Sequence, residues 1–275
     1  MRVIIKDNFE DLSTFTANYI AKKINNVAEG SFLNVIFPVG NSNSKTYEIL
    51  IDMVKSKQLS FKSVRIFQMD EFVGLEKDSN FAQRNQLYEH LLKHIDINPK
   101  NVHLFDAWVP AAELDEECEN FERKIEECGG IDFAFFGTGA DGHLARNEPG
   151  SSIQSKSRKT FLAFDTRLQL AQRWEMVIDE IPQWTVTAGI NTLYRAKDLL
   201  VIFSGVSRAH ALERVLENSI NHMFPVSAFQ THGSCIFVCD EDATNELRVK
   251  TVHYFKSIAE TAKLCWEKEL VEKRV

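Results

Sequence analysis

The chain has 275 residues, of which 44% are hydrophobic, and its formal net charge at pH 7 is −7. This length can bury a large core, and because no Pro/Ser-rich or charge-block linker divides it, we expect a single domain over residues 1–275. The acidic balance argues against a nucleic-acid surface, which needs clustered Lys and Arg, but it leaves room for a local basic pocket that binds a small anion.

Cysteine usage and the N-terminus bear on the cellular compartment. Five cysteines leave one unpaired in any full disulfide scheme, and none shows the CxxC spacing of a metal site. Free thiols in a reducing compartment are therefore expected. The apolar run at residues 3–5 is too short for a signal peptide, and no segment approaches the ~18 apolar residues of a membrane span. We expect a cytoplasmic protein without a membrane partner.

The first half of the chain alternates short apolar runs with segments of helical periodicity. Strands are predicted at residues 2–6, 33–37, 64–69 and 102–105. Helices are predicted at residues 9–27, 45–57, 86–94 and 112–128. This alternation favours an α/β fold with an open, mostly parallel sheet covered by helices on both faces.

A polar loop joins the second predicted strand to the helix that follows it. The loop consists of Gly40, Asn41, Ser42, Asn43 and Ser44, after Pro38 and Val39. Free backbone N–H groups and the helix dipole both favour an anion at such a position, so the loop is a candidate phosphate cradle. An ordinary Ser/Asn helix cap has a similar sequence, and the pattern alone leaves both interpretations open.

The candidate catalytic residues follow two other strands. Asp70 comes directly after the third predicted strand, at the sheet edge where ligands bind, although a turn or a helix cap is the alternative. The apolar run 131–136 leads into a glycine-rich loop with Asp141, His143 and Glu148. Asp141 and His143 are two residues apart, so an extended backbone would point both to one side. Carboxylates beside an imidazole can move protons near neutral pH, which favours a site over unrelated surface residues.

The second half continues the alternation after a polar loop that carries Arg158 and Lys159. Strands are predicted at residues 160–164, 185–189, 199–203 and 234–240. Residues 168–181 have the pattern of a mixed helix or lid, and helices are predicted at 209–217 and 244–269, the latter with an apolar stripe assigned to the core. Ser204, Gly205 and Arg208 precede the first of these helices, which predicts a second phosphate cradle with a guanidinium in the first helical turn.

Several segments together give the chain a resemblance to a known family. The combination of Met69-Asp-Glu-Phe-Val-Gly-Leu75 and Gly137-Thr-Gly-Ala-Asp-Gly-His-Leu-Ala-Arg-Asn-Glu-Pro149 is specific, and Asp165-Thr-Arg167 is a further matching segment. With these residues the chain resembles the glucosamine-6-phosphate deaminase (isomerase) family over nearly its whole length. The resemblance implies a modified Rossmann-like fold and the conversion of glucosamine 6-phosphate and water to fructose 6-phosphate and ammonia, without a metal or an organic cofactor.

The same resemblance implies roles for individual residues. Asp70 would be the base that shuttles a proton between C2 and C1 of the open-chain sugar. His143, supported by Asp141 and Glu148, would open the pyranose ring. The residues expected to bind the substrate are Gly40, Asn41, Ser42, Asn43, Ser44, Gly137, Arg173 and Arg208.

The chain departs from the family pattern in its binding residues. The first phosphate loop lacks the usual Gly-Ser/Gly-Thr-Pro sequence, and Arg208 stands where Lys is usual. The Arg expected after the Asp165 segment falls on Gln172, with Arg173 beside it. These departures leave the stereochemistry of the sugar open.

The family also implies regulation. Its activator, N-acetylglucosamine 6-phosphate, binds between the subunits of a hexamer, so the resemblance implies a homo-oligomer. The matching residues are Ser151, Arg158, Lys159 and Tyr254. An ordinary polar loop and an ordinary helix surface are the alternative interpretation of these residues.

Three other functions remain open at the level of the sequence. One is an isomerase or deaminase for another sugar phosphate, such as galactosamine 6-phosphate. A sugar-lactone hydrolase is disfavoured, because hydrolysis does not explain Asp70. A non-catalytic sugar-phosphate sensor is the third, although a sensor need not keep all four acid/base residues.

Overall fold

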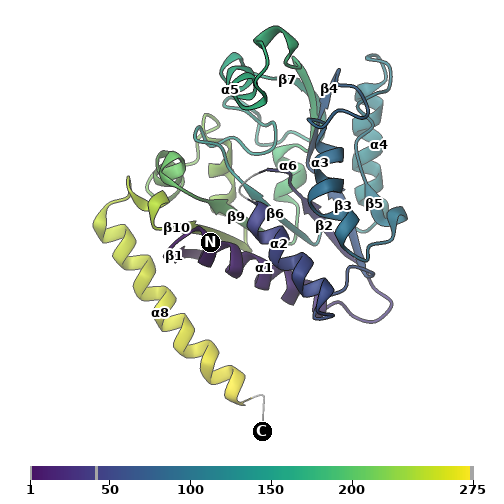
Figure 1. The fold of residues 1–275 in the computed structure, drawn as a ribbon. Helices are drawn as coiled ribbons and strands as arrows, with labels where there is room; N and C mark the ends of the chain where they lie inside the picture. The colour runs from purple at the N-terminus through teal and green to yellow at the C-terminus, as the bar shows by residue number, and fades with distance from the viewer. Residues whose placement is uncertain (1, 41–42, 273–275) are drawn as a thin grey trace.

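The computed structural model describes residues 2–40 and 43–272, and their side chains as far as residue 261. Within the described residues, seven parallel strands form the main sheet (Figure 1). Their order across the sheet is β1 (Arg2–Lys6), β10 (Cys235–Asp240), β9 (Asp198–Phe203), β6 (Phe133–Gly137), β2 (Leu33–Phe37), β3 (Val64–Gln68) and β5 (Val102–His103). The predicted α/β class with a mostly parallel sheet is confirmed.

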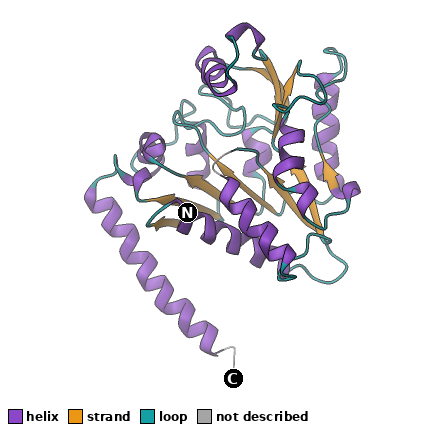
Figure 2. Ribbon diagram, viewed as in Figure 1, coloured by secondary structure: helices purple, strands orange, loops and turns teal. Residues whose placement is uncertain are grey.

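Helices cover both faces of this sheet (Figure 2). Buried residues alternate between the two faces along each strand, so that Val35 and Phe37 pack on one side and Ile36 on the other. The first face is covered by α1 (Phe9–Asn25), α2 (Ser44–Lys55) and α3 (Gln83–His90). The second is covered by α4 (Leu114–Glu127), α6 (Ile190–Tyr194) and α7 (Ala209–Leu216).

A second, antiparallel sheet was not predicted from the sequence. It has the order β4 (Asp70–Val73), β8 (Trp184–Thr187) and β7 (Arg158–Phe161). A small core with Phe72, Leu162 and Leu170 joins this sheet to α5 (Phe164–Trp174). Asp70 therefore belongs to a strand of its own, and the turn and helix-cap alternatives for it are wrong.

Several predicted boundaries differ from the structure. The predicted strand at 160–164 is β7, which ends at Phe161, and Phe164 already begins α5. The predicted mixed helix or lid at 168–181 consists of most of α5 and a 3-10 turn, η4 (Ile178–Glu180). Arg208 ends another 3-10 turn, η5 (Val206–Arg208), immediately before α7, and so does not lie in the first turn of the α-helix. Other 3-10 turns are η2 (Leu92–His94), η3 (Pro99–Asn101), η6 (Pro225–Thr231) and η7 (Asp242–Thr244).

The C-terminal helix α8 (Val249–Glu272) extends away from the body of the molecule (Figure 1). Its first turns contact the core through Val252 and Phe255. Ile258 is 45% exposed, so the prediction that the whole apolar stripe is core is wrong at this position. The stripe residues Ala262 and Cys265 lie outside the residues whose side chains are described.

Four cysteines in the described part of the chain are free thiols, namely Cys118, Cys128, Cys235 and Cys239. Burial raises the pKa of Cys235 and of Cys239 to about 12, which makes both thiols unreactive near neutral pH. No helix in the described residues is both long enough and apolar enough to cross a membrane.

Candidate active site

A cavity of about 540 Å³ lies at the carboxyl ends of the central strands of the main sheet. Residues at or just after the ends of four adjacent strands line it: Ser207 and Arg208 after β9, Gly137 and Thr138 at β6, Pro38 after β2, and Met69 after β3. The chain order reverses between β6 and β2, and ligands bind at such switch points in open α/β sheets. Helix α5 supplies another wall through Asp165, Thr166, Gln169, Leu170 and Arg173.

The glycine-rich loop after β6 brings Asp141 and His143 together. The Nδ1 atom of His143 lies 2.6 Å from the Oδ1 atom of Asp141, and the backbone N–H of His143 donates to the same oxygen at 3.1 Å. Because a carboxylate only accepts, Nδ1 carries the proton and Nε2 is the free basic nitrogen of neutral His143. Burial acts to raise the pKa of Asp141, but the hydrogen bond and charge of His143 outweigh it and hold that pKa below its ordinary value.

The reason for this pairing differs from the one predicted. Residues 140–142 form a turn, with Gly142 at a φ of +77°, so the backbone between the two side chains is not extended. Gly139 is the residue that makes room for the imidazole. A Cβ atom there would lie 2.2 Å from two atoms of the His143 ring.

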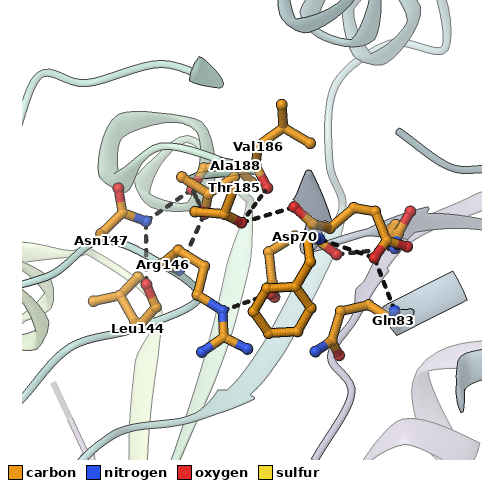
Figure 3. Close-up of polar contacts among 12 residues, drawn as sticks. Asp70, Gln83, Leu144, Arg146, Asn147, Thr185, Val186 and Ala188 are labelled. Atoms are coloured by element: carbon orange, nitrogen blue, oxygen red, sulfur yellow. Dashed lines mark hydrogen bonds and ion pairs between the residues drawn. The ribbon is translucent and has the colours of Figure 1, made fainter. Parts of the chain in front are cut away.

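Asp70 lies on β4 and forms a buried ion pair with Arg146. The Nε atom of Arg146 donates to Oδ2 of Asp70 at 2.9 Å, and the two side chains are 15% and 9% exposed (Figure 3). The guanidinium also lies over the ring of Phe72, 4.6 Å from its centroid. Thr187 faces Asp70 across the β4–β8 ladder, and its hydroxyl accepts from the backbone N–H of Arg146 at 3.1 Å.

Glu148 is oriented differently from the other candidate acid/base residues. Its Oε2 atom accepts from the backbone N–H of Ala163 at 2.8 Å, next to the start of α5. Its Oε1 atom is buried and has no hydrogen-bond partner among the described residues. The described cavity lining includes Asp70, Asp141 and His143 but not Glu148. The structure therefore brings three of the four predicted catalytic residues to one cavity, and Glu148 is not among the described residues that line it.

The first predicted cradle contributes Gly40 and Asn43 to the cavity. The backbone N–H of Asn43 donates to the carbonyl oxygen of Gly40 at 3.0 Å, and α2 begins at Ser44. Asn43 is 1% exposed, and its Oδ1 atom has no hydrogen-bond partner among the described residues. Asn41 and Ser42 lie outside the described residues.

The second predicted cradle contributes Arg208, which lies opposite the first. Asp240 holds the start of this loop by accepting from the backbone N–H of Gly205 at 2.9 Å. The Nε atom of Arg208 donates to the carbonyl oxygen of Thr138 at 3.3 Å. Burial lowers the pKa of Arg208, and the positive charge of Arg173 lowers it further, whereas Asp141 acts in the opposite direction. Two guanidinium groups that repel each other in one cavity favour an anionic ligand.

The candidate activator residues form only part of a site within one chain. Arg158 donates through Nη1 to Oδ1 of Asn147 at 2.7 Å and through Nη2 to Oγ of Ser151 at 3.3 Å. Lys159 lies on the same strand, β7. Tyr254 lies on α8, which Figure 1 shows well separated from β7. One chain therefore does not bring Tyr254 to the other three residues.

Arg146 and the α5 wall residues other than Arg173 were not predicted from the sequence. Arg146 lies within the glycine-rich segment, and its positive charge beside the candidate residues Asp141, His143 and Glu148 was the available signal. The residues Asp165, Thr166 and Gln169 line the cavity. The first two belong to α5 because this helix starts at Phe164, earlier than predicted. Among the described residues, no group of three or more His, Cys, Asp or Glu is placed to hold a metal ion.

The sequence matches the family model described as glucosamine-6-phosphate isomerases/6-phosphogluconolactonase over residues 7–237. Glucosamine-6-phosphate deaminase 2 of Xenopus tropicalis is 43% identical over 260 residues, which cover 94% of this chain and 94% of the relative.

Solved structures show the same relationship. A monomeric glucosamine-6-phosphate deaminase superposes with a TM-score of 0.83 at 29% identity, covering 90% of this chain and 100% of the other. The 6-phosphogluconolactonase of Trypanosoma cruzi superposes with a TM-score of 0.71 over 90% of this chain and 96% of the other. At 17% identity, the second likeness concerns the fold alone.

Proposed function

This chain belongs to the glucosamine-6-phosphate isomerase/6-phosphogluconolactonase family, and on that premise we propose that it is a deaminating isomerase. It converts glucosamine 6-phosphate and water to fructose 6-phosphate and ammonia. The observation that carries this proposal is one cavity lined by a carboxylate on β4, by the His–Asp pair of the loop after β6, and by the guanidinium groups of Arg173 and Arg208. Its volume of about 540 Å³ is in the usual range for small-ligand sites.

The substrate phosphate binds between the two cradles. Arg173 and Arg208 supply the positive charge, and the first-loop residues supply backbone and side-chain donors. Buried Asn43, whose side-chain oxygen has no hydrogen-bond partner among the described residues, is suited to contact the ligand. The assignment of amide oxygen and nitrogen in Asn43 can reverse to suit that ligand. Anchoring the phosphate fixes the position of the sugar carbons relative to Asp70 and His143.

Ring opening is the first chemical step. Nε2 of His143 takes the proton of the anomeric hydroxyl and a proton is delivered to the ring oxygen as the C1–O5 bond breaks. Asp141 fixes the imidazole orientation and stabilises its protonated form. Glu148 acts on this step through the shape of its loop, because no hydrogen bond joins it to His143 within the described residues.

Isomerisation follows on the open-chain sugar. Asp70 removes the proton from C2 and returns it to C1, which shifts the double bond from C1=O to C2=N. Water then adds to C2 and the C2–N bond breaks, so that ammonia leaves and a ketone remains. Each proton removed is delivered again within the cycle, and no oxidant or reductant is consumed.

Replacement of the base tests this function. Asp70→Asn should lower kcat by at least the ~10²–10⁴-fold typical of general acid–base catalysis, because an amide cannot accept the C2 proton. Ammonia release and ketose formation should be followed together, with glucosamine 6-phosphate and galactosamine 6-phosphate as substrates. Asp52→Asn, on the exposed face of α2, is the matched control. Near wild-type turnover by Asp70→Asn would exclude this mechanism.

We also propose a homo-oligomeric, cytoplasmic protein. Support for the location comes from the free buried thiols expected in a reducing compartment. One solved relative is monomeric, so the oligomeric state of this chain has to be measured on this protein itself. Light scattering of the purified protein and fractionation of cells answer the two questions separately.

A further inference from the structure

Arg146 combines two properties that the proposed mechanism does not yet use. Its Nε atom donates a hydrogen bond to the catalytic candidate Asp70 (Figure 3). Its side chain also lines the cavity. Within the described residues, neither Nη1 nor Nη2 has a hydrogen-bond or ion-pair partner. The side chain thus has one nitrogen engaged with the base and two nitrogens available to a ligand.

The Asp70 carboxylate is held on one side only. Oδ2 accepts from Arg146, whereas Oδ1 has no hydrogen-bond partner among the described residues. The ring of Phe72 packs against the face of the Arg146 guanidinium, and the β4–β8 ladder fixes the backbone of Asp70. This arrangement fixes the position of Oδ2 and leaves Oδ1 available to accept and donate the substrate proton.

We propose that Arg146 is a further residue of the isomerisation step, which positions Asp70 through Nε and stabilises the enolate oxygen of the substrate through Nη1 and Nη2. When Asp70 removes the proton from C2, negative charge develops on the oxygen at C1. A cation adjacent to the base attracts that charge, so it stabilises the transition state more than it stabilises the bound substrate. This difference in stabilisation is the condition for catalysis. This proposal rests on the proposed function.

A competing role for Arg146 is phosphate binding. Arg146 and Arg173 both also line a second, adjoining cavity of about 450 Å³, so Arg146 is not confined to the end of the site near Asp70. A phosphate contact would act in the substrate complex and the transition state alike, so that its loss would raise KM at constant kcat. Loss of an enolate contact would lower kcat instead.

Arg146→Met and Arg146→Ala are the test variants. Met keeps the length and the packing on Phe72, while Ala leaves space for an added guanidinium ion. We expect kcat to fall by about 10²–10³-fold, as for loss of one oxyanion donor, with KM near the wild-type value. Guanidinium chloride at millimolar concentration should restore part of kcat in Arg146→Ala. The matched control is Arg195→Ala, an exposed arginine at the end of α6, which should show wild-type kcat with and without guanidinium.

The outcomes separate the possible roles. An unchanged kcat would overturn the proposal, whether or not KM is raised. It would also be overturned by a lowered kcat that guanidinium does not restore and that is accompanied by a lower melting temperature. If both variants fail to fold, Arg146→Lys carries the test, since Lys retains the charge but not the fork. A lowered kcat at constant KM in folded Arg146→Lys supports the proposal, and wild-type kcat overturns it. Wild-type protein that releases no ammonia would instead refute the proposed function itself.

Discussion

At the scale of single residues, the ring-opening group depends on the absence of a side chain at Gly139. The His143 ring occupies the space where a Cβ atom of residue 139 would lie, at 2.2 Å from Cε1 and Nδ1. Oδ1 of Asp141 would lie 2.7 Å from the same Cβ. The loop backbone is also fixed there, because the N–H of Gly139 donates to the carbonyl oxygen of His143 at 2.9 Å. Neither partner of the pair can keep its place once a methyl group is added.

Gly139→Ala should therefore reduce catalysis. We expect kcat to fall by at least about 10²-fold, because the imidazole is moved from the position that proton transfer requires. Gly233→Ala is the matched control, since nothing lies within 4 Å of a Cβ at that position and its φ is not left-handed. Turnover and thermal unfolding should be measured for both variants. Normal turnover in Gly139→Ala would show that His143 has no essential place in the reaction.

At the scale of elements, Asp198 joins the end of α1 to the sheet. It is the first residue of β9, and its carboxylate accepts hydrogen bonds from Lys23, in the last turn of α1, and from Ser234. Burial acts to raise the pKa of Asp198, but these hydrogen bonds and the charge of Lys23 outweigh it, so the pKa lies below its ordinary value. A folded-state pKa below the unfolded value stabilises the protein at neutral pH, and this stabilisation is lost as the pH falls through the folded value.

Asp198→Asn should lower the free energy of unfolding at pH 7 by about 1–3 kcal/mol, the usual effect of removing a charged hydrogen-bond acceptor. Below the ordinary Asp pKa of about 3.9, the difference from the wild-type protein should begin to shrink, because the unfolded chain then binds a proton at Asp198 that the folded protein does not yet bind. Urea unfolding at pH 7 and at pH 3 measures both values. Asp52→Asn, in an exposed pair with Lys55, should change stability by less than about 0.5 kcal/mol. An equal loss for Asp198→Asn at both pH values would contradict the assignment.

The parallel strands could be predicted because their sequence pattern is local. The central ones are short apolar runs, such as residues 199–203, that are buried on both faces and bounded by polar loops. The positions of Asp70, Asp141 and Arg208 at the ends of such strands followed from the same pattern. Their convergence on one cavity is a consequence of parallel strand order, which places all carboxyl ends on one edge.

The small antiparallel sheet could not be predicted because its pairing is between distant segments. β4 pairs with β8 more than a hundred residues later. The alternating pattern of β8 predicts a strand, but a local pattern does not identify its pairing partner, and β4 has only four residues without such alternation. Glu71 illustrates the difficulty. It directly follows Asp70 in the sequence, yet it is fully buried and accepts from the backbone N–H groups of Phe72, Gln83 and Arg84. Burial raises the pKa of Glu71, although these hydrogen bonds act in the opposite direction.

At the scale of the whole molecule, charge is distributed unevenly between surface and site. The formal net charge is −7, yet the cavity contains three arginines, Arg146, Arg173 and Arg208. An acidic surface opposes non-specific binding to nucleic acid, while the basic cavity attracts a phosphate ester. Composition alone therefore left room for a local basic pocket but did not identify the arginines that form it.

Regulation is the remaining question at this scale, and the structure suggests how a bound anion would act. Arg158 lies between the loop of Ser151 and the side chain of Asn147, which neighbours Glu148. Asn147 in turn donates to the carbonyl oxygen of Ala188 at 2.8 Å. An anion that competes for Arg158 would weaken its bond to Asn147 and so alter the loop that carries His143. Because α8 lies apart from β7, Tyr254 can reach such an anion only from another subunit.

We therefore expect N-acetylglucosamine 6-phosphate to shift the substrate-saturation curve to lower substrate concentrations, and to do so only in an oligomer. Such a shift requires the activator to bind the active arrangement more tightly than the inactive one, since equal affinity for both changes nothing. Arg158→Ala should abolish the shift, whereas Lys62→Ala, at an exposed position near β3, should retain it. Saturation curves and light scattering on the same samples measure both quantities. Identical curves with and without activator, or a protein that is monomeric throughout, would remove the regulatory proposal and leave the catalytic one intact, because Asp70, Asp141 and His143 all line one cavity of a single chain.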